Sequence, residues 1–188
     1  LFCGEALAGS LADRWRAAAP GSALHNLYGP TEATIAITGY GVAPGEPLDQ
    51  RLDGVVAIGR PFAGQRFAVL DEAGTPVGPG GRGELWLAGS QVTDGYWHEA
   101  AETAARFRAG PTALGRLGTE EQGSDAVASW FRTGDHVHLG ADGTLYALGR
   151  LDDQVKIRGV RVELAEIDRA VREASGCAEA LAVPWPSR

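Results

Sequence analysis

Residues 149–168 read GRLDDQVKIRGVRVELAEID, a long run in which charged and apolar residues alternate before a helical pattern begins. The alternation predicts two strands, over 155–158 and 161–163, joined by a turn at Gly159. Apolar residues four positions apart then predict a helix over 165–174 with one apolar face. On its own, such a charged alternating segment is also typical of a solvated edge strand, which its charges protect from aggregation.

The chain before this stretch combines short strands with long loops. Residues 136–149 predict a β-hairpin that turns at Ala141-Asp142-Gly143, and the runs at 66–70 and 84–88 alternate in the same way. We therefore expect an α/β fold with α+β character, in which a partly antiparallel sheet accompanies a few short helices. The remaining expectations are strands at 1–3, 25–28 and 179–183, helices over 11–18 (capped by Ser10) and 99–107, a loop over 39–54 and a surface insertion over 108–127.

The composition excludes several classes of function. The chain of 188 residues carries 17 basic and 24 acidic residues, a net charge of −7, which argues against binding to nucleic acid or to an anionic membrane surface. No apolar run approaches the roughly 20 residues that span a bilayer, and no signal peptide opens the chain. We therefore expect a cytoplasmic protein, in which Cys3 and Cys177 are plain buried thiols rather than a disulfide or a zinc site.

Two unusual counts concern methionine and lysine. The sequence has no methionine and a single lysine, Lys156, against sixteen arginines. We therefore expect the chain to be an internal piece of a larger protein. A mechanism that needs two lysines cannot be complete within it.

Residues 26–32, NLYGPTE, place chemically useful groups in successive positions after a short strand. Tyr28 offers a π face to a base, the turn at Gly29 offers a tight backbone to phosphates, and the Glu32 carboxylate is a hard oxygen ligand of the kind that Mg²⁺ prefers. Considered alone, the segment is also typical of an ordinary turn capped by Thr31.

Residues 131–135, FRTGD, end a loop with an acid positioned by a glycine. Asp135 can accept hydrogen bonds from ribose hydroxyls, as acids do in other nucleotide sites, or it can bond its own backbone in a turn. The segment 78–83 matches G-x-G-x-x-G but leads into a strand, so it predicts a turn and not a dinucleotide site. His136 and His138 share a strand face without a third ligand at metal-site spacing and are interpreted as packing or surface residues.

Taken together, five segments resemble the adenylation domains of nonribosomal peptide synthetases, within the adenylate-forming (AMP-dependent synthetase and ligase) superfamily. The matching segments are NLYGPTE at 26–32, GELWLAG at 83–89, DGYW at 94–97, FRTGD at 131–135 and the run at 149–168, in this order and spacing. The resemblance implies that the parent protein is an ATP-dependent ligase. Such a ligase joins an amino acid to ATP as an aminoacyl-adenylate and then loads it onto the phosphopantetheine thiol of a peptidyl carrier protein.

The resemblance also implies a division into domains. Residues 1–151 would form the latter part of the large N-terminal, nucleotide-binding domain, and residues 152–188 would begin the small, mobile C-terminal domain. Asp152 matches the hinge position between them, and Gly159 matches the place where the pantetheine arm enters.

Site residues follow from the same resemblance, position by position. Tyr28 would stack on the adenine of ATP or AMP, Thr31 would meet phosphate oxygens, Glu32 would hold Mg²⁺, and Asp135 and Arg150 would bind the ribose. The backbone of Gly4, Glu5 and Ala6, with Asn26, would lie near the adenine edge, and Gly29 near the phosphates. The acyl pocket would be lined by Leu1, Cys3, Leu27, Ile35 and Ala36, which suggests a hydrophobic amino acid.

The sequence departs from the family pattern in three respects. Position 147 is Ala where relatives carry an aromatic residue, and the insertion at 108–127 is long. The phosphate-gripping loop with its lysine and the adenylate-forming lysine both fall outside the chain, so we expect residues 1–188 to be inactive alone. Two alternatives remain open, a fragment of an acyl- or aryl-CoA ligase and a non-catalytic interaction fragment.

Overall fold

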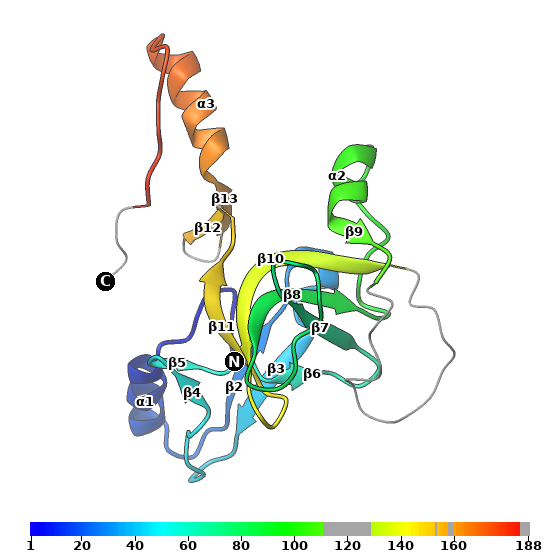
Figure 1. Ribbon diagram of the computed structural model, residues 1–188. Coiled ribbons are helices and arrows are strands. Elements are labelled where there is room, and N and C mark those ends of the chain that lie inside the picture. The colour runs from blue at the N-terminus through cyan, green and yellow to red at the C-terminus, as the bar shows by residue number, and fades with distance from the viewer. Residues whose placement is uncertain (111–128, 153, 158–159, 185–188) are drawn as a thin grey trace.

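The computed structural model describes residues 1–110, 129–152, 154–157 and 160–184 (Figure 1). The surface insertion expected at 108–127 lies outside the described residues except for its first three positions, and so does Gly159. Several sheets and few helices make up the described chain, which confirms the expected mixture of strands and helices. No described helix is both long and apolar enough to cross a bilayer.

The first sheet is built from the N-terminal part of the chain. It has the order β1 (Phe2–Cys3), β2 (Leu24–Tyr28), β3 (Thr38–Val42) and β6 (Arg60–Pro61). Strands β1 and β2 are parallel, whereas β3 runs antiparallel to both of its neighbours. Helix α1 (Gly9–Ala18) buries Ala12 in a cluster with Leu24 and Val42, so the helix covers one side of this sheet.

The second sheet is entirely antiparallel. Its order is β11 (Leu145–Arg150), β10 (Trp130–Leu139), β8 (Arg82–Ala88) and β7 (Arg66–Leu70), and the short β9 (Phe107–Arg108) also pairs with β10. The strands predicted at 66–70 and 84–88 and the hairpin at 136–149 are confirmed. Helix α2 (Ala100–Arg106) leads directly into β9.

The main core lies between these two sheets. Tyr28 and Ile37 from the first sheet region pack with Leu87 and Val137 of the second in one buried cluster. The backbone joins the sheets as well, because the Leu145 N–H donates to the Gly59 carbonyl at 2.8 Å. Removing such side chains from water contributes about 1.5–3 kcal/mol each. The end of β2 is therefore held firmly against β8, β10 and β11.

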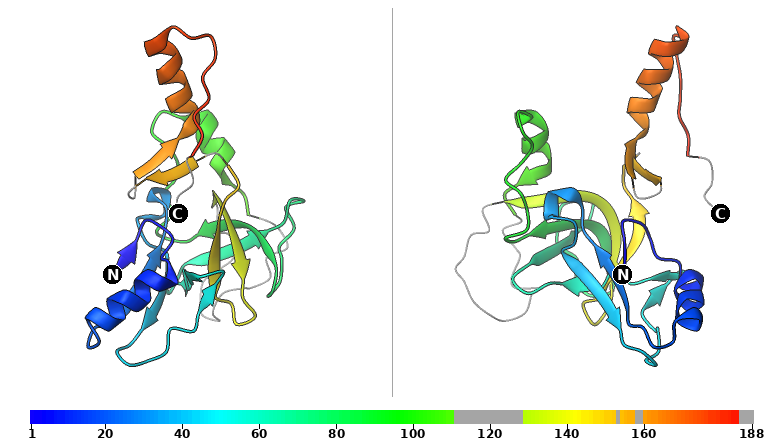
Figure 2. Two further views of the ribbon diagram at one scale, coloured as in Figure 1. Left: turned by 90° about the vertical axis from the view of Figure 1, so that its left-hand side faces the viewer. Right: turned by 180° about the vertical axis from the view of Figure 1, so that it is seen from behind.

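The last described segment is an arm that projects from the two sheets in all three views (Figures 1 and 2). It consists of the hairpin β12 (Gln154–Ile157) and β13 (Val160–Glu163), followed by α3 (Leu164–Ser175). None of the α3 residues is buried within the described chain. Smaller elements complete the fold: η1 (Thr31–Ala33), β4 (Arg51–Leu52) and β5 (Val55–Val56).

The expected loop over 39–54 is confirmed for residues 43–50 but is wrong at both ends, because β3 occupies residues 38–42 and β4 occupies residues 51–52. Strand β3 carries two glycines and no apolar alternation, so its pattern is that of a loop. It forms because it pairs residue for residue with β2, and because Gly39 leaves room for the Phe62 ring and the Leu27 side chain. Tertiary pairing overrides local propensity here.

Three smaller expectations are also corrected. Helix α1 begins at Gly9 with Ala8 as its N-cap, so Ser10 does not cap it; the Gly9 N–H donates instead to the Gly54 carbonyl at 2.7 Å. The segment 179–183 is not a strand, since it pairs with no strand among the described residues. Cys3 and Cys177 are both exposed rather than buried.

Candidate nucleotide site

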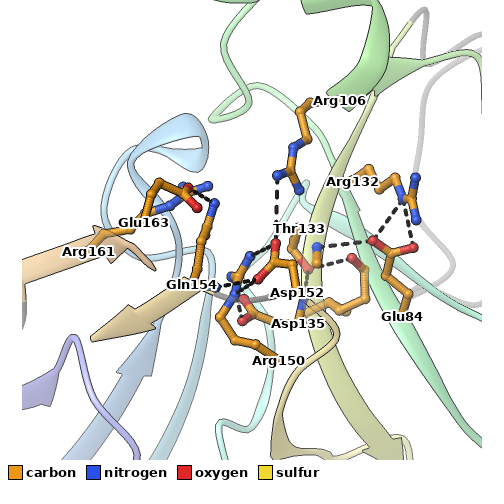
Figure 3. Close-up of polar contacts among 12 residues, drawn as sticks. Glu84, Arg106, Arg132, Thr133, Asp135, Arg150, Asp152, Gln154, Arg161 and Glu163 are labelled. Atoms are coloured by element: carbon orange, nitrogen blue, oxygen red, sulfur yellow. Dashed lines mark hydrogen bonds and ion pairs between the residues drawn. The ribbon is translucent and has the colours of Figure 1, made fainter. Parts of the chain in front are cut away.

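The Asp135 carboxylate is the centre of the candidate site. Its Oδ1 accepts a hydrogen bond from Arg150 Nη1 at 2.9 Å, and its Oδ2 accepts one from the Tyr28 hydroxyl. The two sheets supply these groups separately, with Tyr28 at the end of β2 and the others on the neighbouring strands β10 and β11. Residues from three distant motifs thus meet at one carboxylate, and Figure 3 shows two of them, Asp135 and Arg150.

A local irregularity in β10 aims the Asp135 side chain. The register of β10 against β8 shifts between Arg132 and His136, which is the signature of a bulge. Within it, the Thr133 hydroxyl donates to the Leu85 carbonyl at 2.7 Å and accepts from the Asp135 N–H at 2.9 Å. The side chain of Thr133 therefore ties the irregular backbone to β8 and fixes the orientation of Asp135.

Glu84 anchors the same bulge from the other side. Its carboxylate accepts a hydrogen bond from the Gly134 N–H at 3.1 Å and two from Arg132 Nε at 2.9 and 2.8 Å (Figure 3). The Glu84 side chain is largely buried, whereas that of Arg132 is half-exposed. Buried carboxylates need such partners, so Glu84 exchanges its hydration for contacts that hold the backbone at Gly134.

Arg150 connects the carboxylate of Asp135 to that of Asp152. Its Nε lies 2.6 Å from Asp152 Oδ1, and its Nη2 lies 2.5 Å from Asp152 Oδ2. Arg106 of α2 adds a longer ion pair, with Nη2 3.6 Å from Asp152 Oδ2. Burial by itself would raise the pKa of Asp152, but Arg150 and, more weakly, Arg106 outweigh it, and the pKa lies below its usual value.

Gly134 forms the floor beneath this cluster of charges. Its φ of +74° is one that residues with side chains rarely adopt, and a Cβ here would lie 2.7 Å from Arg150 Nη2 and 2.8 Å from Asp152 Oδ2. The Gly134 carbonyl also accepts from the Leu151 N–H at 2.9 Å. The segment 150–152 is therefore packed directly onto a glycine backbone.

Glu32 lies in a second polar cluster, at η1. The Tyr96 hydroxyl donates to Glu32 Oε1 at 2.5 Å, and Arg161 Nη1 lies 3.0 Å from the same oxygen and 3.3 Å from Oε2. Burial raises the pKa of Glu32, but these two donors outweigh it and hold the pKa below its ordinary value. Glu32 is therefore an ionised, buried carboxylate whose oxygens are both engaged.

The loop after β2 shapes the surroundings of Glu32. Thr34 and Ile35 both have positive φ, and the Ile37 N–H returns to the Tyr28 carbonyl at 2.8 Å. Gly29 lies under this fold-back, because a Cβ there would be 2.7 Å from the Ile35 carbonyl oxygen. Thr31 is exposed at the start of η1 and is available to a ligand.

Asn26 forms no hydrogen bond with the Asp135 or Glu32 cluster among the described residues, and the turn at 4–6 is largely exposed. The Asn26 amide is buried and donates to the Ala57 carbonyl at 2.9 Å, while its Oδ1 has no partner among the described residues. The turn Gly4-Glu5-Ala6 follows β1, with Gly4 partly buried and the other two residues exposed. Asn26 thus holds β2 to the segment before β6, on the same face of the strand as Tyr28.

The five expected pocket residues gather along β1, β2 and the loop after β2. Cys3 and Leu27 are neighbours in the parallel pairing of β1 with β2, and the Cys3 thiol lies 3.9 Å from the Ile35 carbonyl. Leu1 and Ile35 are largely exposed, and Ala36 packs against Gly29. These residues form an open apolar surface.

Six side chains of the two clusters were not among the expected site residues. Three of them support Asp135 and its bulge: Glu84, Arg132 and Thr133. The other three pair with Glu32 or Asp152: Tyr96, Arg106 and Arg161. Tyr96 belongs to the DGYW segment and Arg161 to the 149–168 run, both quoted above as motifs. Arg106 ends a short alanine-rich helix, and nothing in its local sequence marks it as part of a site.

Comparison with known proteins assigns the fold and the site to a family. The model of the AMP-binding enzyme family matches residues 1–97, just over half of the chain. Phosphinothricin tripeptide synthetase PhsB of Streptomyces viridochromogenes is 47% identical over 169 residues, which are 89% of this chain and 13% of that protein. The chain therefore belongs to the AMP-binding enzyme family.

Two solved structures refine this assignment. The adenylation domain AlmE of Vibrio cholerae, in complex with glycyl-adenosine-5′-phosphate, superposes with a TM-score of 0.78 at 36% identity, covering 98% of this chain and 32% of that one. PA1221, a nonribosomal peptide synthetase protein with adenylation and carrier domains, gives 0.75 at 29% identity, covering 90% and 31%. Within the family, the chain is similar to the adenylation domains of nonribosomal peptide synthetases, and it spans about a third of these structures.

Proposed function

We propose that this chain supplies the ribose- and adenine-binding part of an adenylation domain. The observation that carries the proposal is the convergence of Tyr28 and Arg150 on the Asp135 carboxylate. An ionised carboxylate between two strands can accept hydrogen bonds from vicinal hydroxyls, and bonds to a charged acceptor are stronger than neutral ones. The Tyr28 ring lies beside this carboxylate, but it is 9% exposed and packed in the core. Stacking on adenine, worth about 1–3 kcal/mol per base in other proteins, therefore requires one face of the ring to become accessible.

In the first half-reaction, a carboxylate oxygen of the amino acid attacks the α-phosphorus of ATP. The bond between the α-phosphorus and the bridging oxygen breaks, and pyrophosphate leaves with the electron pair. Asp135 and Arg150 hold the ribose so that the α-phosphorus lies near η1, where the exposed Thr31 hydroxyl can bind a phosphate oxygen. Positioning of this kind accounts for much of the acceleration in such reactions.

Glu32 fits a magnesium site of the open kind. Mg²⁺ is typically bound by one or two carboxylates together with substrate phosphates and waters, and Glu32 offers one buried, ionised carboxylate beside Thr31. When bound there, the ion would offset the charge that develops on pyrophosphate. This role requires Arg161 to withdraw from the two oxygens that it contacts in this structure.

We propose in addition that residues 1–151 belong to the large domain and 152–188 to a small domain that rotates about Asp152. The projection of the arm in Figure 2 and the exposure of α3 support a separate body. In the second half-reaction a phosphopantetheine thiol attacks the carbonyl carbon, and AMP leaves. The carrier domains in relatives such as PA1221 support a peptidyl carrier protein as the partner.

The substrate we propose is an amino acid with an apolar side chain. The support is the surface formed by Leu1, Cys3, Leu27 and Ile35, which carries no charge. Measuring ATP–pyrophosphate exchange by the full-length protein, with each amino acid in turn, tests both the apolar substrate and the role of Asp135 in nucleotide binding. We expect exchange with an apolar amino acid and its loss in the Asp135→Ala variant. Thioester formation from free coenzyme A and a simple carboxylic acid, without such exchange, would contradict the proposal.

A further inference from the structure

The ion pair between Arg161 and Glu32 joins two parts of the chain that lie on either side of Asp152. Arg161 is on β13 in the projecting arm, whereas Glu32 is in η1 of the first sheet region. Of the described residues from 154 onward, Arg161 is the one whose side chain forms an ion pair with the chain before Asp152. Among the described residues, this ion pair therefore links the arm to the first sheet region.

The two side chains of this ion pair differ in their exposure to solvent. The Glu32 side chain is only 8% exposed, and the Arg161 side chain is 34% exposed. A carboxylate this buried is costly to leave without a counter-charge, and the single hydrogen bond from Tyr96 does not supply one. The Arg161 side chain, which is partly exposed, can return to water at a smaller cost than Glu32 can lose its counter-charge.

A divalent cation and Arg161 would compete for the same two oxygens. Arg161 Nη1 lies within 3.3 Å of both, so a cation bound there would face a guanidinium at close range. Like charges at such a separation repel strongly in a buried environment. A divalent metal ion and the Arg161 guanidinium therefore cannot occupy Glu32 at the same time.

We propose that the Arg161–Glu32 pair is a latch that holds the arm in the orientation seen here, and that this latch closes only after the metal has left Glu32. The inference rests on the proposed function in so far as Glu32 is the metal ligand. It places this orientation after the release of metal and pyrophosphate, at the stage of transfer to the thiol. Arg161 is then a positioning residue, because the orientation of the arm depends on whether Glu32 binds Arg161 or the metal ion.

The latch can be tested by the distance between two spin labels on the full-length protein, carried by unnatural amino acids at Glu72 and Ala174. Both positions are exposed, one in a turn of the second sheet and the other in α3. Without Mg²⁺ we expect one dominant distance for the wild type. Arg161→Gln should lower that population relative to all others by about fivefold, the effect of losing a partly exposed ion pair. Arg169→Gln, which removes an exposed pair within α3, is the matched control and should leave the distribution unchanged.

The competition with metal is tested by adding ATP with Mg²⁺ or ATP with a chelator, in the absence of amino acid. ATP with Mg²⁺ should shift the wild type toward the Arg161→Gln distribution, and it should leave that variant unchanged. An unchanged distance distribution in Arg161→Gln would contradict the latch. A wild-type distribution that does not change on addition of ATP with Mg²⁺ would contradict the competition between Arg161 and the metal ion for Glu32. Failure of the proposed function is seen separately, as absence of amino-acid-dependent pyrophosphate exchange by the wild type.

Discussion

Arg150 binds Asp135 through Nη1 at 2.9 Å, on the carboxylate oxygen opposite the one that the Tyr28 hydroxyl occupies. The carboxylate is therefore held from both sheets at once, and its orientation does not depend on either sheet alone. Burial, followed by the negative charge of Asp135, raises the pKa of Tyr28 well above its usual value. The hydroxyl thus stays protonated and remains a donor to Asp135 at neutral pH.

The Tyr28 ring and its hydroxyl should contribute separately to nucleotide binding. Tyr28→Ala removes the stacking surface and should weaken AMP binding by about 1–3 kcal/mol. Tyr28→Phe keeps the ring and removes only the bond to Asp135, so its loss of affinity should be smaller. Isothermal titration calorimetry with AMP measures both variants. Equal losses would show that adenine does not stack on this ring.

Gly134 should be intolerant of a side chain because of what lies above it. Gly134→Ala would place a Cβ 2.7 Å from Arg150 Nη2, in addition to the strain of a positive φ. Gly143→Ala is a matched control, since Gly143 has a φ of +84° and no atom within 4 Å of its Cβ position. We expect urea denaturation to show a loss of about 1 kcal/mol for the control from backbone strain alone, and a clearly larger loss for Gly134→Ala. Equal losses of unfolding free energy would mean that Arg150 and Asp152 move aside from the new Cβ at no energetic cost.

Glu84 should stabilise the fold through the Gly134 N–H. Glu84→Leu leaves that buried donor without its partner, which costs about 1–3 kcal/mol, while the half-exposed Arg132 returns to water. Glu72→Leu alters an exposed acid in the turn after β7 and serves as the control. Thermal unfolding of the two variants measures the difference. A Glu84→Leu protein as stable as its control would contradict the anchoring role.

Asp142 should make stability depend on pH at the turn of the hairpin formed by β10 and β11. The Thr144 N–H, the Thr144 hydroxyl and Arg60, in that order, lower the pKa of Asp142 in the folded protein. A lowered folded-state pKa gives a contribution that is fully present above the unfolded value near 3.8 and is lost as the pH falls through the folded value. Because the group is exposed, the contribution should be at most about 1 kcal/mol.

Comparison of the wild type with Asp142→Asn checks this sign. Urea denaturation should find the wild type more stable from pH 7 down to about pH 5, and the two proteins should converge at more acid pH. A difference that grows toward low pH would contradict the assignment.

The sequence predicts those elements whose pattern is set by burial on one face. The run at 136–139 alternates because Val137 and Leu139 are buried whereas His136 and His138 are partly exposed. The bounds predicted for β7 at 66–70 also agree with the structure, although residues 67–70 are all buried. Strand β3 was missed because Gly39 and Gly41 carry no pattern; its position is dictated by pairing with β2, which local sequence does not encode. The absence of a strand at 179–183 has the opposite origin, since a suitable pattern there finds no neighbour among the described strands.

The candidate site was predictable where a motif places a reactive group and its support close together in sequence. Asp135 and Arg150 belong to such motifs, and adjacent strands bring them together. Arg161 and Tyr96 reach Glu32 from 129 and 64 residues away, and Arg106 reaches Asp152 from a helix without any motif. These contacts depend on the packing of the arm and of α2, which the pattern of single residues does not reveal.

The most direct test of the account is whether Asp135 recognises the ribose hydroxyls. Calorimetry should compare the binding of AMP and of its 2′,3′-dideoxy analogue to the full-length wild type and to Asp135→Asn. We expect the wild type to bind AMP at least about tenfold more tightly than the analogue, because hydrogen bonds to a charged group contribute about 1.5–3 kcal/mol. The variant should bind the two ligands almost equally. A variant that keeps the full preference for AMP would contradict the placement of the nucleotide at Asp135.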